Sequence, residues 1–535
     1  MKILTSTAMK AAEAAAVERG GSYLDLMENA GGAAAKRIAA LLNGIAGKQA
    51  LIFCGKGNNG GDGLVIARKF LEAGALVTVI FAQGCGDAGV DEQKLSPLSR
   101  ANLRAMDGWG EDRLLILDCT LGDEQLAALV QQAAVIVDAV FGTGFSGILP
   151  AGTARLNRAA AKACGLLCAL DIPSGVNCDT GEADADSFPA EVTFAFAALK
   201  PAHVLKASAL RCGRVELLDI GIGRSDMDAL PSAIAPLTRT LAANALPRRS
   251  PDSHKGSYGR LLNVGGCRHM TGAVMLSTLA AMAGGAGLVK VAAPDAATPL
   301  IAGRILPCIH APLPTAENGA ISFEGIDRLS EELRWATTLL LGCGLSVCED
   351  TKLLVEELIT QTQIPAVLDA DALNCLVGRP SLLRRASAPL ILTPHLMEMS
   401  RLTGEPLEHC RSRRFDLAAS FAREYQVTLV LKDSSTVVAA PDGSLYMTAP
   451  PKRTVDGIPV FEGSSTSGLA KGGSGDILAG LIAAMLAQGA SPLQAALCGV
   501  WLHARAADLC EEEMTAYCMQ PTDVLRFLPA AFKLL

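Results

Sequence analysis

Blocks of apolar and polar residues in the first half of the chain predict a β-loop-α-β unit. Between Lys48 and Gly84 an apolar run (ALIFC) leads into a glycine-rich loop, a helical stretch (GLVIARKFLEAG) and a second apolar run (LVTVIFA). Two later apolar runs end in a carboxylate, AAVIVD at Asp138 and GLLCALD at Asp171. We therefore predict a doubly wound α/β domain, with the first 44 residues forming helices that pack against it.

The second half repeats this kind of pattern with different sequences. Its apolar runs GLVKVAAP, WATTLLLGCG, IPAVLDAD, PLILTPH and VTLVLKD alternate with helical patterns, which predicts a second α/β domain. Between the halves the chain becomes rich in proline and arginine and shows no period. We place the first domain at residues 1–225, a linker at 226–250 and the second domain at 251–535.

Composition narrows the class of protein. The 535 residues carry a net charge of -7 and contain no long basic run, so we expect no nucleic-acid partner. The longest apolar run, Ile477 to Ala487, is too short for a membrane span and predicts a buried helix. The chain start does not resemble a signal peptide and the 16 cysteines are scattered, so we expect a cytoplasmic location with buried free thiols.

The stretch GKGNNGGDGLVIAR, residues 55–68, places a bare loop at the start of a predicted helix. Backbone N–H groups in such a loop can approach an anion, and the helix dipole favours its charge, so a phosphate-containing ligand fits. A tight turn is the alternative, although one or two glycines would suffice for it. The stretch has neither the G-x-G-x-x-G pattern nor a Walker ending, which argues against an ordinary dehydrogenase or P-loop protein.

Oxygen-bearing residues follow the strands of the first half. The loop, Asp138 and Asp171 should converge on one cleft, because the carboxyl ends of parallel strands line the ligand crevice of an open sheet. Asn59, Asp138 and Ser174 offer the oxygen donors of a hard monovalent cation, although Asp138 could instead cap a helix or turn. Asp171 could act as a general acid or base.

In the second half the motif GGSGDILAG indicates phosphoryl transfer. Gly472, Gly473 and Gly475 offer amides at a helix start, and Asp476 could take a proton from an attacking hydroxyl. A helix cap is the alternative. Lys432 could contact phosphate or be a solvated lysine at a strand end, and His395 could be catalytic or structural.

Taken together, these motifs make the chain resemble the bifunctional NAD(P)H-hydrate repair enzymes. The matching stretches include LMENAG, DAVFGTGFSG, LDIPSGVNCDTG and VTFAFAALK in the first half, and HKGSYGRLLNVGG, VLDADALN and GVWLHARAAD in the second. The resemblance implies a Rossmann-like domain that epimerises the hydrates of NADH and NADPH at C6 and a ribokinase-like domain that dehydrates them with ADP or ATP. It also implies homo-oligomers: dimers for the first half and tetramers for the second.

The resemblance also implies specific site residues. Asp171 and Asp476 would be the catalytic groups. The hydrate would contact the first domain at Asn58, Asn59, Gly60, Gly61, Asp62, Gly142, Thr143, Gly144, Phe145, Ser146, Gly147, Ile148 and Asp171. It would contact the second domain at Ala273, Gly344, His395 and Asp476. The nucleotide, accompanied by magnesium, would contact Lys432, Asp433, Ser434, Ser435, Thr436 and Gly475. Potassium would bind at Asn59, Asp138 and Ser174.

Two departures from the family pattern lie in the second half. Leu396 and Met397 replace a Pro-Gly pair, and DSST from Asp433 onward replaces Gly-Ala-Gly-Thr. The Asp433 carboxylate would repel phosphate unless it turns away. Alternatives are therefore a small-molecule kinase of the ribokinase-like class with a non-catalytic ligand-binding or scaffold module in front, or an active epimerase joined to a second half that has lost its activity.

Overall fold

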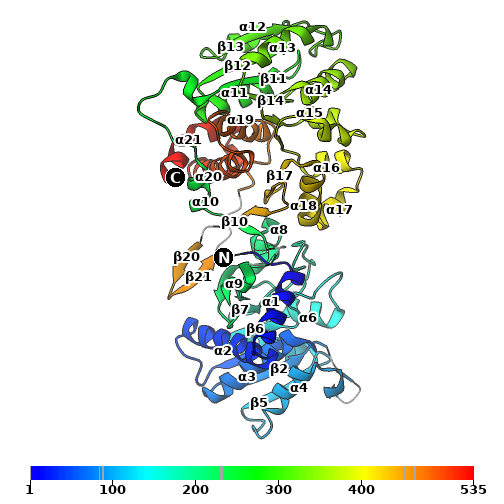
Figure 1. The fold of residues 1–535 in the computed structure, drawn as a ribbon. Helices are drawn as coiled ribbons and strands as arrows, with labels where there is room; N and C mark the ends of the chain where they lie inside the picture. The colour runs from blue at the N-terminus through cyan, green and yellow to red at the C-terminus, as the bar shows by residue number, and fades with distance from the viewer. Residues whose placement is uncertain are drawn as a thin grey trace. The chain divides into compact units, whose positions relative to one another are not determined.

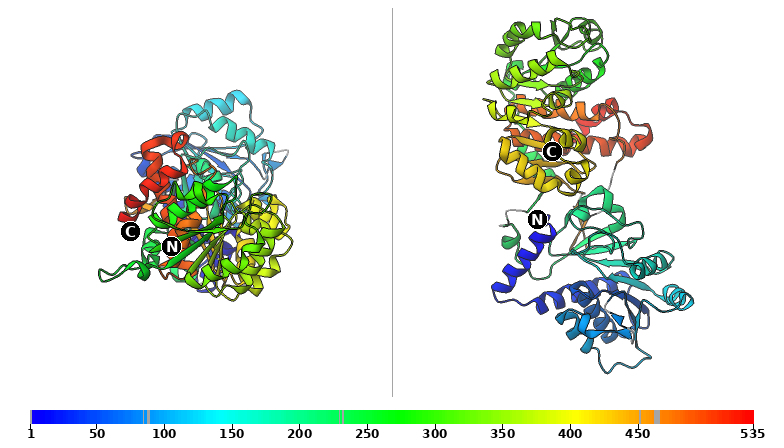
Figure 2. Two further views of the ribbon diagram at one scale, coloured as in Figure 1. Left: turned by 90° about the horizontal axis from the view of Figure 1, so that it is seen from above. Right: turned by 90° about the vertical axis from the view of Figure 1, so that its right-hand side faces the viewer.

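A computed structural model of the chain describes residues 2–83, 85–86, 89–228, 230, 233–450, 452–461 and 466–535. The chain divides into two compact units. The first contains Met1–Ala235 and Ala449–Gly463, and the second contains Pro236–Thr448 and Ser464–Leu535. Each unit is built around its own large sheet (Figures 1 and 2).

The sheet of the first unit has nine strands in the order β20-β21-β9-β8-β7-β6-β1-β2-β5. The strands from β9 to β5 run parallel, as predicted for a doubly wound domain. The strands are β1 Gln49–Cys54, β2 Leu76–Phe81, β5 Leu114–Asp118, β6 Val135–Ala139, β7 Leu166–Leu170, β8 Val192–Phe196, β9 Arg214–Leu218, β20 Lys452–Val455 and β21 Ile458–Phe461. A separate pair consists of β3 Cys85–Gly86 and β4 Gly89–Val90.

Helices cover both faces of this sheet because its central strands are apolar on both sides. In β1, Leu51 and Phe53 join one core cluster while Ile52 and Cys54 join another. The helices are α1 Ser6–Glu18, α2 Tyr23–Leu41, α3 Asn58–Glu72, α4 Pro97–Arg104, α5 Asp123–Gln132, α6 Ala151–Ala160, α7 Pro201–Val204, α8 Lys206–Cys212 and α9 Arg224–Asp228. The predicted N-terminal helices are α1 and α2, and both contribute to the larger cluster.

The sheet of the second unit has ten strands in the order β10-β19-β18-β17-β16-β15-β14-β11-β12-β13, parallel from β17 to β13. The strands are β10 Ala235–Leu237, β11 Arg260–Val264, β12 Leu288–Pro294, β13 Ile309–Leu313, β14 Thr338–Leu341, β15 Ala366–Leu368, β16 Leu390–Leu392, β17 Thr428–Leu431, β18 Val437–Ala439 and β19 Leu445–Thr448.

The helices of the second unit include the long apolar run found in the sequence. That run lies in α19, where every residue from Ile477 to Ala487 is buried. The helices are α10 Arg239–Ala245, α11 Thr271–Ala283, α12 Thr298–Ala302, α13 Ile326–Trp335, α14 Glu349–Gln361, α15 Asp371–Cys375, α16 Leu396–Thr403, α17 Leu407–Ser412, α18 Arg414–Tyr425, α19 Ser474–Ala487, α20 Pro492–Cys518 and α21 Pro521–Leu534. None of the helices among the described residues has the length and hydropathy needed to cross a bilayer.

The division into domains differs from the sequence-based prediction in two ways. The boundary lies between Ala235 and Pro236, and the segment 226–250 holds the end of α9 and all of β10 and α10 rather than only a linker. Positions 229, 231 and 232 of that segment lie outside the described residues. In addition, the hairpin β20–β21, which comes from the predicted second domain, belongs to the first unit.

The hairpin is bound to the first unit through backbone pairing and a charge network. Strand β21 pairs antiparallel with β9, and both Val460 and Phe461 are buried. The Arg37 guanidinium of α2 donates to both carboxylate oxygens of Glu216 on β9, at 2.6 and 3.2 Å, and to Asp456 in the hairpin turn at 2.8 Å. Arg37 and Glu216 are buried, whereas the Asp456 side chain is 72% exposed.

These exposures predict unequal effects of removing the two acids. Glu216→Gln should destabilise the first unit by about 3–5 kcal/mol because it leaves Arg37 charged, buried and poorly paired. Asp456→Asn should cost less than about 1 kcal/mol, as at an exposed pair. Urea unfolding can be followed through Trp109 after Trp335→Phe and Trp501→Phe. Equal losses from the two substitutions would contradict this account of the network.

Candidate active sites of the two units

A cavity of about 440 Å³ lies at the carboxyl edge of the first sheet, where the strand order turns between β1 and β6. Of the sequence-predicted hydrate contacts, the structure brings seven together around it: Asn58, Asn59, Asp62, Gly142, Thr143, Gly144 and Asp171. The other six are not among its lining residues. Phe145 is buried in a small apolar cluster, Ile148 is 89% exposed, and Gly60, Gly61, Ser146 and Gly147 lie elsewhere in the two loops.

Close packing accounts for the glycines at the start of α3. A Cβ at Gly60 would lie 2.0 Å from the carbonyl oxygen of Gly55, and a Cβ at Gly61 would lie 2.6 Å from the Met27 side chain. These two glycines therefore let the helix pack closely against its own loop and against α2. The sequence-based prediction explained them by access for an anion, but close packing explains these two. The exposed Gly57, which caps α3, has open space around it and keeps that access.

Asp171 follows β7 and is held by four contacts. Its backbone has a φ of 59°, an uncommon conformation for a residue with a side chain. Oδ1 accepts hydrogen bonds from the Lys200 ammonium and from the Phe196 amide, the latter at 3.2 Å. The Asp171 amide donates to Phe194, and the His203 ring contacts the Asp171 carbonyl at 2.6 Å. The side chain is thus fixed, with 13% of its surface exposed.

The neighbours of Asp171 have defined protonation states. His203 Nδ1 accepts from the Lys200 amide at 3.0 Å, so its proton lies on Nε2, which donates to Asp171. Burial lowers the pKa of His203 to about 4, and the ring is neutral. Lys200 is fully buried and also donates to the Phe196 carbonyl at 2.7 Å.

Two further carboxylates face the same cavity. Burial, followed by the charges of Asp171 and Glu13, raises the pKa of Asp62 well above its usual range. Burial and the charge of Asp171 also raise the pKa of Glu13 on α1. Sequence reasoning missed Lys200 and Glu13. Lys200 ends the stretch VTFAFAALK, and its position just after a predicted strand could have marked it as a site residue. Glu13 lies in a helical pattern that contains no such indication.

The three residues proposed for potassium are linked through one peptide segment. Asp138 is fully buried and accepts from the Ser174 amide and hydroxyl, both at 2.6 Å. The Ser174 hydroxyl oxygen accepts from the Phe141 amide at 2.9 Å, and the Asn59 side-chain amide donates to the Phe141 carbonyl at 2.9 Å. Burial raises the pKa of Asp138 to about 6. Among the described residues, Asp138 forms no ion pair.

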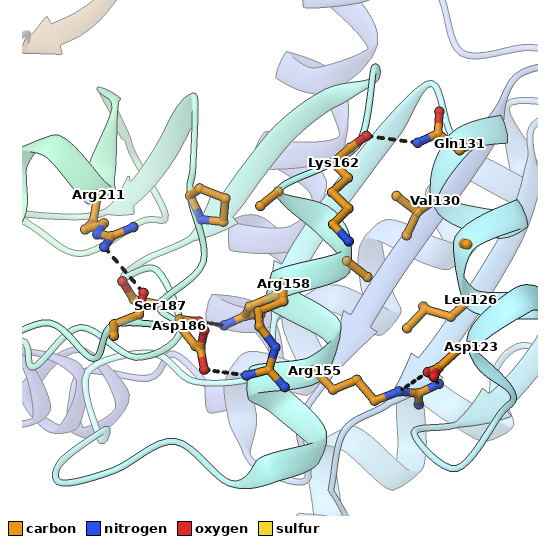
Figure 3. Close-up of a pocket in the computed structure, with 16 residues that line it drawn as sticks. Asp123, Leu126, Val130, Gln131, Arg155, Arg158, Lys162, Asp186, Ser187 and Arg211 are labelled. Carbon is orange, nitrogen blue, oxygen red and sulfur yellow. Dashed lines mark hydrogen bonds and ion pairs between the residues drawn. The ribbon is translucent and has the colours of Figure 1, made fainter.

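The first unit also contains a larger cavity, of about 790 Å³, between α5, α6 and the segment 185–189 (Figure 3). Both of its aspartates are already paired with arginines of the same cavity, Asp123 with Arg155 and Asp186 with Arg158. None of the sequence-predicted site residues lines it. The smaller cavity is therefore the candidate site, because that is where buried, unneutralised acids gather.

In the second unit, strand ends bring several charged residues together. Lys432, after β17, donates to Asp369, after β15, at 2.7 Å and lies 3.9 Å from Glu398. Cys343, Asp369 and Asp476 approach one another closely enough that their ligand atoms lie within 4.8 Å. Burial, followed by the charge of Asp369, raises the pKa of Asp476 to about 6. Asp369, Glu398 and Cys343 were not singled out from the sequence.

The remaining predicted residues of this site lie around that group. A Cβ at Gly344 would lie 3.0 Å from the side chain of Ala273, and a Cβ at Gly475 would lie 3.2 Å from the Lys432 ammonium. His395 caps α16: its ring accepts from the Glu398 amide at 3.1 Å, and its own amide donates to Glu398 at 2.8 Å. The departure at Leu396 and Met397 thus keeps Glu398 buried beside Lys432.

The stretch from Asp433 to Thr436 has an arrangement that the sequence did not indicate. The Asp433 carboxylate accepts from the nearly buried Arg414 of α18 at 2.9 Å, so a cation neutralises it. Ser434 is exposed and Ser435 is buried. The Thr436 amide donates to Thr448 of β19 at 3.1 Å. This pairing with Arg414 reduces the repulsion that the Asp433 carboxylate alone would exert on a phosphate group.

Comparisons with known proteins agree with the two-unit organisation. Residues 23–202 match the YjeF-related protein N-terminus family, and residues 261–530 match the NAD(P)H-hydrate dehydratase family. The bifunctional NAD(P)H-hydrate repair enzyme of Moorella thermoacetica is 38% identical over 94% of this chain and 91% of its own length. That of Coxiella burnetii is 34% identical over 94% of this chain and 93% of its own.

A solved structure is also similar to part of this chain. The ADP/ATP-dependent NAD(P)H-hydrate dehydratase of Bacillus subtilis, co-crystallized with ATP/Mg²⁺, is 30% identical, covers 56% of this chain and 98% of its own, and superposes with a TM-score of 0.47. The resemblance inferred from the motifs is confirmed by the sequence matches across nearly the full length. The chain belongs to the family of bifunctional NAD(P)H-hydrate repair enzymes.

Proposed function

We propose that the first unit interconverts the two C6 epimers of hydrated NADH and NADPH, and that the second unit dehydrates one epimer to NADH or NADPH with ADP or ATP. The observation that carries this proposal is that both family-implied acids, Asp171 and Asp476, lie at carboxyl sheet edges among buried charged groups. The match of both halves to the repair enzymes favours it over a kinase with a non-catalytic module.

In the second unit Asp476 would remove the proton of the hydrate hydroxyl while that oxygen attacks the terminal phosphorus of the nucleotide. The phosphorylated hydrate would then lose phosphate from C6 and a proton from C5, restoring the dihydronicotinamide. Lys432 and the amides at Gly473 and Gly475 would bind nucleotide phosphates. Magnesium would arrive on those phosphates as part of the co-substrate.

The first unit would use Asp171 to move protons at C6, with potassium at Asn59, Asp138 and Ser174. The residues fit this ion, because Asp138 is a buried carboxylate without an ion-pair partner among the described residues and its neighbours offer oxygen donors. When bound, the ion would supply positive charge that stabilises the loop of Phe141 and Gly142. These residues themselves orient the cavity wall through the hydrogen bonds that link β6, β7 and α3.

The cysteines support a reducing compartment. Those of the described residues are free and most are buried, as the sequence predicted. We therefore propose a cytoplasmic location for the repair activity.

The assay that tests the function is recovery of nicotinamide absorbance from a mixture of both epimers. Wild-type protein should restore all of it when ADP or ATP is present. Asp171→Asn should stop at the share of one epimer, and Asn suits the positive φ of that position. Asp476→Asn should abolish recovery while leaving epimerisation intact. Loss of both activities in either variant would contradict two independent sites, and no recovery by the wild type would favour the kinase alternative.

The acidity of Asp476 predicts how dehydration depends on pH. A general base must be deprotonated, so kcat should fall as pH drops through about 6, the pKa to which burial and Asp369 raise this carboxyl. Asp476→Asn should lower kcat by about 10²–10⁴-fold and remove this dependence. A profile flat between pH 5 and 7 in the wild type would argue against Asp476 as the base.

Potassium should stabilise the first unit without any substrate. At ten times its dissociation constant the ion adds about 1.4 kcal/mol, which corresponds to roughly 3–6 °C for a domain of this size. Thermal unfolding in potassium chloride and in tetramethylammonium chloride measures the difference. Asp138→Asn should remove it, whereas Asp123→Asn, at an exposed aspartate of the same unit, should keep it. An identical difference in both variants would place the ion elsewhere.

A further inference from the structure

Three carboxylates line the cavity of the first unit, and among the described residues only one of them forms an ion pair. Asp62, Asp171 and Glu13 come from α3, from the end of β7 and from α1, and all three line the cavity together with Lys200. The Lys200 ammonium is hydrogen-bonded to only one of them, Asp171. The other two acids line the same cavity and form no ion pair among the described residues, so burial favours their protonated forms.

Asp62 lies on α3 and lines the cavity, where it can contact a bound substrate. It follows Asn58 by one helical turn, so the two residues and Asn59 present one face of α3 to the cavity. Its surroundings contain charged or titratable groups from every neighbouring element: Lys10 and Glu13 of α1, Tyr23 of α2, Lys56 of the loop before α3, Asp171, Lys200 and the neutral His203. Burial with Asp171 and Glu13 raises the pKa of Asp62, which agrees with a protonated carboxyl at neutral pH.

We propose that Asp62 is the second catalytic residue of the epimerisation, a proton donor working with Asp171 as base, and that Lys200 is the positioning residue that holds the Asp171 carboxylate in place. This inference rests on the proposed epimerase function. When the surroundings of two acids shift their pKa values apart, one acid can serve as the proton donor and the other as the base. The hydrate is a hemiaminal, in which C6 carries a hydroxyl and is bonded to the ring nitrogen N1, and its epimerisation requires one proton acceptor and one proton donor.

With these two carboxyls, each proton released in the reaction has an acceptor and each proton needed has a donor. Asp171 accepts the proton of the C6 hydroxyl, the C6–O bond becomes a carbonyl, the N1–C6 bond breaks with its electron pair moving to N1, and Asp62 donates its proton to N1. After the carbonyl group rotates about the C5–C6 bond, N1 attacks the other face of C6. Asp62 then recovers its proton from N1, and Asp171 returns its proton to the oxygen. The ring is closed again with C6 inverted, and no oxidant or reductant is needed.

Kinetics of epimerisation in the full-length protein test the proposal. Asp62→Asn keeps the shape of a protonated carboxyl but cannot transfer a proton, so kcat should fall by about 10²–10⁴-fold with KM nearly unchanged. The wild type should lose activity at high pH as Asp62 ionises. The high-pH loss should be absent from the residual activity of Asp62→Asn. Glu13→Gln removes a charge that raises the pKa of Asp62, so this variant should keep the high-pH loss of activity but show it at lower pH.

Lys200 is tested by its effect on Asp171. Lys200→Met should lower the kcat of epimerisation with KM nearly unchanged, and Lys200→Arg, which keeps a cation beside Asp171, should restore part of that rate. Trp109 fluorescence reports whether the first unit of each variant is folded. If Lys200→Met does not fold, the Asp62→Asn and Glu13→Gln profiles still decide the assignment of the acid.

Three outcomes are distinguishable. A wild type that does not epimerise overturns the proposed function itself. A wild type that epimerises, with an Asp62→Asn variant that keeps its kcat and its high-pH loss, overturns the role of Asp62. A Glu13→Gln variant that loses the high-pH limb while Asp62→Asn keeps it overturns the proposal in favour of Glu13.

Discussion

In each unit a largely buried lysine is paired with an aspartate at the carboxyl edge of the sheet. Lys200 binds Asp171 in the first unit, and Lys432 binds Asp369 in the second. A buried ion pair costs free energy to desolvate, so it persists where further hydrogen bonds support it. Phe196 and His203 supply that support around Asp171, and Thr393 supplies it to Asp369 at 2.6 Å.

Each pair leaves an additional carboxyl close by that no lysine neutralises. In the first unit that carboxyl is Asp62 and in the second it is Asp476, and burial raises both pKa values. The two sites therefore use the same electrostatic device for different chemistry. A carboxyl shifted far above its usual pKa is suited to donate a proton, whereas one near 6 is suited to accept a proton at neutral pH. The roles proposed for the two carboxyls are therefore opposite, a proton donor at Asp62 and a proton acceptor at Asp476.

Local pattern predicted the parts of these sites that strand ends position. Asp138 and Asp171 each end an apolar run, and the rule for parallel sheets correctly placed Asp171 at the cavity, whereas Asp138 is fully buried against Ser174 and does not line the cavity. The pattern could not reveal partners separated in sequence. Lys200 meets Asp171 across 29 positions, and Arg414 neutralises Asp433 from another element. The glycines of α3 were identified as special, but packing against Gly55 and Met27 explains Gly60 and Gly61. The hairpin was missed because β20 and β21 are short and join a sheet formed by the opposite half of the chain.

The late position of that hairpin in the sequence has a consequence for synthesis on the ribosome. Strand β9 emerges more than two hundred residues before β20 and β21. At ~5–20 residues per second, the nascent first unit would present an unpaired sheet edge for roughly 10–50 s. Such an edge can pair with strands of other chains unless charged residues on it prevent the pairing. Glu216, held between Arg37 and Arg214 on β9, places charge in the middle of that edge, so the network that later anchors the hairpin would also protect the unfinished protein from aggregation.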